Sequence, residues 1–463
     1  MRRRAFKTVF YVLYPVVDFL TITFAILVSY KIYRLLGIGQ QVQYAKIHII
    51  PVSVTASLIA IVVLLIFGAY KRESSLLNVE EIKNVVKGIS FSYLLFAVAL
   101  VFMVYAPSRY VLVFSYISSV MLVVIERTIL YHILPLTKTI KGANKRVLIY
   151  GAGELGQALF RSIVNSPRLE IVPVGFVDDD LKKSGMAYRS SGFTNSHTTL
   201  PVLGTGDDVG ALIEQFGIDE IYVAISNIEN SRFAEIKKKL DTHKMRVSFV
   251  PHLHSAFIHK VNIRHIGQIP LVREEFNVRT YFYKRYVDLF LAMVLLFLLT
   301  PVFLIIALAI KMDSKGPVFF RQDRVGKDGT IFQIYKFRSM FSDADPYAVN
   351  PLSADDARIT RTGRYLRRTS MDELPQIINV LKGEMSFVGP RPEMPFIVAQ
   401  YGEIHKERLR VLPGITGLWQ LSGDRQRAIH ENMDYDLYYV RNCSFFLDMA
   451  ILIETAIFAL RGI

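Results

Sequence analysis

Four long apolar segments dominate the first third of the chain. They cover residues 9–30, 47–70, 88–106 and 110–131. Each is about 19 to 24 residues long, enough to cross a hydrocarbon core of roughly 30 Å as a helix. Lysine and arginine cluster before the first segment, between the second and third, and after the fourth. The positive-inside rule then places both ends of this region in the cytoplasm, and we predict a four-helix membrane anchor over residues 1–140.

Charged residues also lie after the first segment and inside two of the segments. Lys31, Arg34 and Lys46 weaken the charge contrast without reversing it. Asp18 and Glu126 fall within apolar segments, where an acidic side chain is costly unless it meets a partner. We therefore expect these two carboxylates at helix–helix contacts or at the interface rather than on a transport path.

Beyond residue 145 the pattern changes to alternating strands and helices. A predicted strand at 146–150 leads into a G-x-G-x-x-G loop that opens a helix, and a second strand at 171–177 ends in consecutive aspartates. This order is the dinucleotide-binding fingerprint, in which the acid meets a ribose. Two further strands, at 220–225 and 246–250, each follow a predicted helix. The loop residues and the acid are Gly151, Gly153, Gly156 and Asp178.

This predicted Rossmann-like module covers residues 141–265. Its strands and helices occupy only about 110 residues, half of a full dinucleotide domain. Two interpretations therefore stay open. The module binds a nucleotide, or it keeps the fold for a structural or regulatory role.

A fifth apolar segment follows at residues 287–310. Its length alone is typical of a transmembrane helix. Thr300 and Pro301 lie near its middle, however, and proline removes a helix hydrogen bond and bends the axis. A full crossing would also carry the basic, cysteine-poor remainder to the opposite face. A crossing helix and a helix that enters and leaves on one face are equally compatible with the residues.

The pattern of residues 316–340 predicts a β-hairpin. Apolar residues alternate on both sides of a Lys327-Asp328-Gly329 turn. Basic residues stud this hairpin and the segment after it. They are Arg321, Arg324, Lys336, Arg338, Arg358, Arg361, Arg364, Arg367 and Arg368. A charge run is usually a solvated face, but this one leads directly into a pair of carboxylates.

The carboxylate pair is Asp372-Glu373, at the start of a predicted short helix. Ser370 suits the N-cap, and Gly383 suits the exit. The predicted buried face consists of Leu374, Ile377, Ile378 and Leu381. Ser370 and Glu373 also match a capping box, in which the acid only closes the helix start. The basic surroundings and the Gly-Pro-Arg-Pro turn at 389–392 favour instead a phosphate site, where the acids hold a metal ion or react covalently.

Composition agrees with a membrane protein that binds anions. The chain has 463 residues, 52% of them hydrophobic, a mean hydropathy of +0.32 and a formal net charge of +15. Nucleic acid, anionic lipid and phosphorylated substrates are the polyanions that such a charge attracts. The single cysteine, Cys443, cannot form an intramolecular disulfide and indicates a cytosolic location for most of the chain. No cleavable signal peptide is evident.

Several motifs follow one another in order through the last third of the chain. They are Lys336-Phe-Arg-Ser-Met340, Asp356-Ala-Arg-Ile-Thr360, Thr369-Ser-Met-Asp-Glu-Leu-Pro375, Asn379-Val-Leu-Lys-Gly383, Val388-Gly-Pro-Arg-Pro392 and Pro413-Gly-Ile-Thr-Gly-Leu-Trp-Gln420. With these motifs, residues from about 280 to the end resemble the bacterial polyprenyl-phosphate sugar-1-phosphate transferases, and we predict a catalytic domain over residues 266–463. That family initiates exopolysaccharide, O-antigen and capsule synthesis. The anchor and the nucleotide-fold module resemble the family's large form.

The resemblance implies a two-step, ping-pong transfer. Asp372 would attack the sugar-bearing phosphate of a UDP-sugar, usually glucose or galactose, and release UMP. Undecaprenyl phosphate would then take the sugar-1-phosphate from the phosphoryl-aspartate. Glu373 would assist, and the two acids would hold Mg²⁺. The implied phosphate ligands are Lys336, Arg338, Arg367 and Arg391, with Asp436 as a further acidic partner.

The resemblance also implies a re-entrant helix over residues 284–311, broken at Thr300 and Pro301. It places the catalytic domain on the cytoplasmic face of a bacterial inner membrane, in a multi-pass protein. Expected partners are the UDP-sugar, undecaprenyl phosphate and membrane lipid, with no nucleic acid, and the additional module is compatible with a homodimer. The chain has Gly423-Asp424 where the family usually has Gly-Arg, so no ligand role is assigned near residue 424. Cys443 replaces a usual tryptophan.

Two other classes share parts of this organisation. A membrane-anchored NDP-sugar dehydratase or epimerase also joins transmembrane helices to a G-x-G-x-x-G domain. It needs a Tyr-x-x-x-Lys pair, and no tyrosine in the chain has lysine four residues on. A polysaccharide assembly scaffold explains the anchor but leaves Asp372, Glu373 and Arg391 without a role. The transferase accounts for all of these features.

Overall fold

The fold consists of two compact units. The computed structural model describes residues 2–37, 49–70, 77, 79–102, 108–133, 145–164, 171–191, 197–226, 230–241, 245–250, 260–266, 269–275, 280–344, 356–422 and 433–460. One unit comprises Met1–Arg189 with Thr198–Val250, and the other Ser190–His197 with Pro251–Ile463. The first holds the apolar helices of the predicted anchor and the α/β module. The second holds the carboxylate pair.

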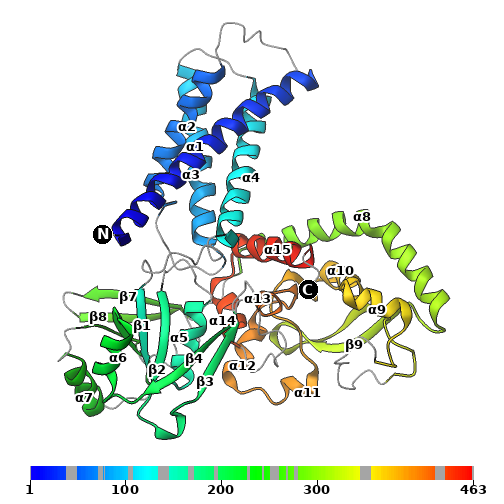
Figure 1. Cartoon of the computed structure of the whole chain (residues 1–463). Helices are drawn as coiled ribbons and strands as arrows, with labels where there is room; N and C mark the ends of the chain where they lie inside the picture. Colours follow the sequence, from blue (N-terminus) through cyan, green and yellow to red (C-terminus); the bar gives the residue numbers. More distant parts are fainter. Residues whose placement is uncertain are drawn as a thin grey trace. The chain divides into compact units, whose positions relative to one another are not determined.

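The four apolar segments predicted in the first third all form helices (Figure 1). They are α1 Arg2–Leu36, α2 Ile49–Ile66, α3 Val79–Phe102 and α4 Arg109–Ile133. Together with α8, Lys284–Asp313, they are the five helices in the described residues that are long and apolar enough to cross a membrane. Many of their large apolar side chains stay exposed, as contact with lipid requires. The protein is therefore membrane-associated.

A buried polar cluster joins the helices of the first unit. Arg127 on α4 pairs with Asp18 on α1 and, at 3.3 Å, with Glu81 on α3, and all three residues are buried. Glu126 accepts a hydrogen bond from the Thr21 hydroxyl at 2.9 Å. Ionisable groups persist among apolar helices only when they are paired in this way. Asp18 and Glu126 are thus helix-contact residues, as expected.

The α/β module contains a six-stranded sheet in the order β3-β4-β2-β1-β5-β6. Its strands are β1 Lys145–Tyr150, β2 Ile171–Val177, β3 Ala187–Ser191, β4 His197–Gly204, β5 Glu220–Val223 and β6 Arg246–Phe249. The pairs β4–β2, β2–β1, β1–β5 and β5–β6 are all parallel. Leu148 and Tyr150 enter one hydrophobic core and Ile149 another, because side chains alternate along a strand. The predicted Rossmann-like α/β module is confirmed.

The sequence pattern did not predict β3 and β4. β4 starts with polar residues and carries Pro201 in its interior, a composition that indicates a loop or an edge. Pairing with β2 makes it a strand nonetheless. The helices of the module are α5 Glu154–Val164, α6 Val209–Phe216 and α7 Asn230–Asp241, with a 3₁₀ turn at Leu181–Lys183.

The second unit combines short helices with two-stranded sheets (Figure 1). The predicted hairpin is confirmed, because β9 Phe319–Val325 and β10 Ile331–Phe337 pair antiparallel around a turn at Lys327–Gly329. The other strands are β7 Lys260–Ile266 with β8 Ile269–Glu275, antiparallel, and β11 Ser386–Val388 with β12 Gly414–Thr416, parallel. The helices after the hairpin are α9 Arg361–Arg368, α10 Gln376–Lys382, α11 Pro395–Val398, α12 Glu403–Lys406, α13 Leu418–Leu421, α14 Met433–Asn442 and α15 Phe445–Leu460.

Helix α8 follows a curved path and continues through Thr300 and Pro301 (Figure 1). The predicted break at Thr300 and Pro301 is therefore wrong. The helix bends there but is not interrupted. Pro301 lacks the N–H that would bond to the preceding turn, which loosens the helix there. The Thr300 hydroxyl donates to the carbonyl of Leu296 at 2.7 Å, a contact that also bends helices.

Both ends of α8 bond to neighbouring elements of the second unit. At its start, Arg285 donates to the carbonyls of Val380 and Leu381 on α10 at 2.5 and 2.8 Å. At its end, Asp313 accepts from the backbone N–H of Thr362 on α9 at 2.7 Å. A straight helix of this length would separate its ends by roughly 45 Å. The curvature instead lets both ends reach the elements that flank the carboxylate pair.

Candidate active site

The carboxylate pair lies in a 3₁₀ turn, Met371–Glu373, between α9 and α10. The flanking Met371 and Leu374 pack against the C-terminal half of α8, so burial of these apolar side chains fixes the turn that carries the two acids. Ser370 precedes the turn with a φ of +55°, and its side chain forms no cap hydrogen bond. Ser370 thus occupies the predicted N-cap position without its hydrogen bond, and the capping-box interpretation of Glu373 is wrong.

Glu373 is the member of the pair whose negative charge is balanced by direct contacts with cations. Its Oε1 accepts from Lys336 Nζ at 2.7 Å and from Arg391 Nη2 at 3.0 Å. Burial raises the pKa of the Glu373 carboxyl, but Arg391 and Lys336 outweigh burial and hold this pKa well below its usual value. Glu373 therefore stays ionised at neutral pH and fixes two cations beside Asp372.

Asp372 has a different environment. Within the described residues, no cation forms a direct ion pair with its carboxylate. Burial raises the pKa of Asp372, Lys336 lowers it, the charge of Glu373 raises it further and Arg367 lowers it, and the net shift is upward. A carboxylate with a raised pKa and no direct ion pair is a stronger nucleophile than one locked between two cations.

Three separate elements bring the cations to the pair. Lys336 lies on β10, Arg367 in the last turn of α9, and Arg391 in the loop after β11. Lys336 and Arg391 contact Glu373 directly. Arg367 acts on Asp372 through its charge. The structure thus gathers three of the four predicted phosphate ligands around the two acids.

A buried amide holds α10 against β10. The Asn379 side chain accepts from the backbone N–H of Tyr335 at 3.0 Å and donates to the carbonyl of Gln333 at 2.7 Å. These bonds fix the strand segment next to Lys336. Because of these bonds, the face of α10 that is buried differs from the predicted face and includes the polar Asn379. The buried residues are Gln376, Ile377, Asn379 and Val380, whereas Leu374, Ile378 and Leu381 are only half-buried. Gly383 ends the helix with a φ of +86°, as predicted.

Arg338 and Asp436 lie outside the group that contacts the acids. Arg338 is buried, and its guanidinium donates to the carbonyls of Lys315 and Ser314, each at 2.7 Å. It therefore secures the segment that follows α8. Asp436 is buried in an ion pair with Arg408 at 2.8 Å. In the described residues neither side chain bonds to the carboxylate pair, so phosphate binding by Arg338 and the role of Asp436 as a further acidic partner stay predictions.

Arg408 is a residue that sequence reasoning missed. Its Nη2 donates to the carbonyl of Arg391 at 2.6 Å, and its Nη1 donates to the Tyr401 hydroxyl at 2.5 Å. It thereby fixes the backbone of the loop that carries Arg391. A basic stretch such as Glu407–Arg410 predicts a solvated face, so the pattern gave no signal for this role.

The G-x-G-x-x-G loop of the α/β module is tightly packed. Gly151 adopts a φ of +109°, and a Cβ at Gly156 would lie 1.9 Å from the Gly151 carbonyl oxygen. Gly153 has open space where a Cβ would point. Asp178, the acid expected to meet a ribose, instead accepts from the backbone N–H of Ala152 at 2.8 Å. Nucleotide binding by this loop stays a prediction.

The two acids fit a magnesium ion that arrives with phosphate. Both cationic donors bond to Oε1 of Glu373, and Asp372 has no direct ion pair in the described residues, so carboxylate oxygens remain on each acid. Mg²⁺ is usually bound through one or two carboxylates together with water and substrate phosphates. No group of three or more His, Cys, Asp or Glu placed for a metal occurs in the part of the chain that the structure describes. The chemistry of these donors thus suits Mg²⁺ with a phosphate substrate.

Comparison with known proteins gives consistent matches. The family described as "Bacterial sugar transferase" matches residues 279–462, and "CoA-binding domain" matches residues 65–251. The UDP-glucose:undecaprenyl-phosphate glucose-1-phosphate transferase of Escherichia coli is 34% identical over 327 residues, covering 68% of each chain. The protein of the same name from Xanthomonas campestris is 36% identical over 276 residues. The undecaprenyl-phosphate galactose phosphotransferase of Salmonella typhimurium is 29% identical over 404 residues, 82% of this chain and 81% of that protein.

These matches cover unequal shares of the relatives, and the chain spans about half of the Xanthomonas protein, 56% of its length. The fold and the site define a membrane-associated protein in which two carboxylates lie among lysine and arginine side chains. The chain belongs to the bacterial sugar transferase family. It is therefore a transferase rather than a dehydratase, an epimerase or a scaffold.

Proposed function

We propose that the chain transfers sugar-1-phosphate from a UDP-sugar to undecaprenyl phosphate and releases UMP, the initiating step of an exopolysaccharide, O-antigen or capsule. The asymmetry of the acid pair is the observation that carries the proposal. Glu373 is locked between Lys336 and Arg391, while Asp372 is free of direct ion pairs in the described residues. The names of the relatives support the donor and the acceptor, with glucose and galactose as the first candidate sugars.

In the first step, an oxygen of Asp372 attacks the phosphorus that bears the sugar. The bond from this phosphorus to the bridging oxygen of the diphosphate breaks, and UMP leaves with that oxygen. Lys336, Arg367 and Arg391 lie where they can neutralise charge on the phosphates, and preorganised cations of this kind are a major source of catalysis. The enzyme is left with the sugar-bearing phosphoryl group on Asp372 as an acyl phosphate.

In the second step, a phosphate oxygen of undecaprenyl phosphate attacks the same phosphorus. The bond to the Asp372 oxygen breaks, which regenerates the carboxylate and yields undecaprenyl-diphosphate-sugar. The same cations then face the lipid phosphate, so one basic site serves both half-reactions. Splitting the transfer in this way is the general logic of covalent catalysis.

Asp372 and Glu373 would hold Mg²⁺ in this site. The ion, when bound, would withdraw negative charge from phosphate oxygens and so ease attack by a carboxylate. Glu373 is suited to this task because its pKa is lowered and it remains ionised at neutral pH. The carboxylate oxygens that Lys336 and Arg391 leave unbonded are the ones available to the ion.

Helix α8 enters and leaves the membrane on one face in this proposal. The support is that its two ends bond to α10 and α9, which flank the same 3₁₀ turn. A lipid phosphate and a soluble nucleotide can then meet at one interface. The distribution of basic residues supports a catalytic domain on the cytoplasmic face of a bacterial inner membrane.

An assay of UMP release tests the proposal. Purified protein is incubated with Mg²⁺, undecaprenyl phosphate and UDP-glucose, UDP-galactose or UDP-N-acetylgalactosamine in turn. We expect UMP, not UDP, with one donor, and we expect Asp372→Asn to lower the rate about 1,000-fold or more, as removal of a nucleophile does. Release of UDP would instead mean glycosyl transfer, and equal rates in the variant would remove Asp372 from the mechanism.

A further inference from the structure

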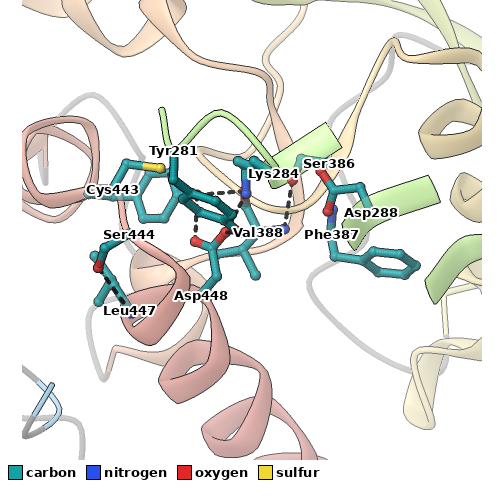
Figure 2. A network of polar contacts seen from close by, with 11 residues as sticks. Tyr281, Lys284, Asp288, Ser386, Phe387, Val388, Cys443, Ser444, Leu447 and Asp448 are labelled. Atoms are coloured by element: carbon teal, nitrogen blue, oxygen red, sulfur yellow. Dashed lines mark hydrogen bonds and ion pairs between the residues drawn. The ribbon is translucent and has the colours of Figure 1, made fainter. Parts of the chain in front are cut away.

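The first turn of α8 carries a buried ion pair that the mechanism above does not use. Lys284 Nζ lies 2.5 Å from Asp448 Oδ2 on α15, and the two residues are only 6% and 5% exposed. Tyr281 and Lys284 both turn toward Asp448 in Figure 2, and the Tyr281 hydroxyl donates to the same carboxylate oxygen at 2.7 Å. Burying two charges costs free energy unless further hydrogen bonds satisfy them. The other hydrogen-bond partners of Lys284 and Asp448 therefore indicate what this ion pair holds in place.

The network leads to one backbone carbonyl, that of Val388. Lys284 Nζ donates to it at 3.2 Å. The Tyr439 hydroxyl lies 2.9 Å from this carbonyl and 2.8 Å from Asp448 Oδ1, so its single proton serves one of these acceptors at a time. Val388 is the last residue of β11 and begins the turn that contains Arg391. An ammonium group on α8 thus holds the start of the loop that carries an active-site cation.

A second contact from the same turn of α8 reaches the same strand. Asp288, one helical turn after Lys284, accepts from the backbone N–H of Phe387 at 3.3 Å (Figure 2). Residues four apart lie on one face of a helix, so Lys284 and Asp288 grip consecutive residues of β11 from one side. Gly389, the next residue, has no room for a side chain, since a Cβ would lie 2.3 Å from the carbonyl oxygen of Leu412. The start of the loop is therefore fixed in position.

We propose that Lys284 and Asp448 are positioning residues for the reaction, and that they act by holding the Val388 carbonyl and thereby placing the Arg391 guanidinium against Glu373. The catalytic part of this inference rests on the proposed function. Because Lys284 is also the first residue of α8, a shift of this apolar helix is transmitted to Arg391. Arg285 makes the matching link to α10, whose start follows the acid pair.

A double-mutant cycle tests this assignment on the full chain in lipid nanodiscs. Lys284→Met, Arg391→Ala and the double variant are compared by kcat and KM for UMP release. We expect Lys284→Met to lower kcat about 10- to 100-fold with little change in KM, as a displaced catalytic group does. In the Arg391→Ala background, the same change should lower kcat less than about twofold, because residues in one network are not additive.

Ser444→Ala is the matched control. The Ser444 hydroxyl accepts from the backbone N–H of Leu447 at 3.3 Å in the first turn of α15 (Figure 2), and this bond does not lead to Val388. The control should keep kcat within about threefold of the parent while losing a helix cap. If the losses from Lys284→Met and Arg391→Ala simply multiply, Lys284 does not act through Arg391 and the proposal is overturned.

The single cysteine gives a readout that needs no turnover. Cys443 Sγ lies 3.6 Å from the Tyr439 hydroxyl. Burial and the charge of Asp448 raise the pKa of the Cys443 thiol and Lys284 lowers it, which leaves this pKa at about 11. Asp448→Asn should therefore lower this pKa, measured from the pH dependence of alkylation by iodoacetamide, whereas Ser444→Ala should not. An unchanged pKa in Asp448→Asn would show that the network is not built as described, whatever the outcome of the UMP assay.

Discussion

At the scale of single residues, two adjacent acids differ because different charges surround them. Glu373 accepts from Lys336 and Arg391 through one oxygen, and its pKa lies below the usual value. Asp372 is one residue away, yet burial and the charge of Glu373 raise its pKa despite Lys336 and Arg367. Environments that push two pKa values apart assign two roles. Here they assign nucleophilic attack to Asp372 and charge placement to Glu373.

This difference predicts the pH dependence of the reaction. Asp372 attacks only when ionised, and its raised pKa means that protonation begins above the usual aspartate value of about 3.9. The rate should therefore fall on the acid side with an apparent pKa above that value, measured from kcat/KM for UMP release across the range in which the protein stays folded. Glu373 cannot produce this limb, because its pKa is lowered. An acid limb at or below the usual aspartate value would contradict the assignment.

The sequence motifs correctly predicted most of the basic residues that lie near the two acids. They did not predict which partner each of these side chains contacts. Lys336, Arg367 and Arg391 gather at the acids as expected. Arg338 does not, because its guanidinium reaches the carbonyls at the end of α8. Arg408 was missed for the same reason: which backbone carbonyl lies within reach of a long side chain depends on the folded chain and leaves no pattern in the sequence.

At the scale of elements, α8 decides how the site meets the membrane. Its apolar surface is largely exposed, while its ends bond to α9 and α10. Proline at its middle bends it without ending it, because the neighbouring turns keep their hydrogen bonds. The lengths of apolar segments predicted this helix, but they could not show whether it crosses, since length is the same in both cases.

Cysteine labelling in oriented membrane vesicles tests the path of α8. In a Cys443→Ser background, Phe282→Cys and Lys315→Cys, placed before and after α8, should react with a membrane-impermeant maleimide from the same face. Arg34→Cys, at the far end of α1, should react only from the opposite face, because α1 crosses the bilayer in the predicted anchor. Reaction of the two α8 positions from opposite faces would show a crossing helix.

Other elements show what local pattern can and cannot predict. The β9–β10 hairpin and the Gly383 exit follow turn chemistry and were predicted correctly. β4 was not, because Pro201 and its polar residues conceal a strand that exists through pairing with β2. The buried face of α10 differs from the predicted one, because hydrogen bonds to β10 rather than hydrophobicity account for the burial of Asn379.

At the scale of the whole molecule, the chemistry is concentrated in the second unit. The bacterial sugar transferase match, residues 279–462, falls within it and includes both acids and the three cations around them, Lys336, Arg367 and Arg391. The described contacts of Asp372 and Glu373 come from this region alone. We therefore predict that the apolar helices and the α/β module of the first unit are not needed for the reaction.

Removal of the first unit, together with residues 190–197 and 251–275 of the second, should leave the reaction intact. A variant that consists of residues 276–463, purified with α8 in detergent or nanodiscs, should release UMP within about tenfold of the rate of the full chain, because a site carried by one domain does not need its neighbours. The same variant with Asp372→Asn serves as the blank. A folded, membrane-bound fragment without activity would show that the removed residues complete the site.

The covalent intermediate tests the central claim most directly. Full-length protein is incubated with Mg²⁺ and its UDP-sugar but without undecaprenyl phosphate, then digested and examined by mass spectrometry. We predict a sugar-phosphate adduct on the peptide that contains Asp372, absent in Asp372→Asn and lost when undecaprenyl phosphate is added. Stoichiometric UMP release with no adduct, or an adduct on another residue, would contradict the account.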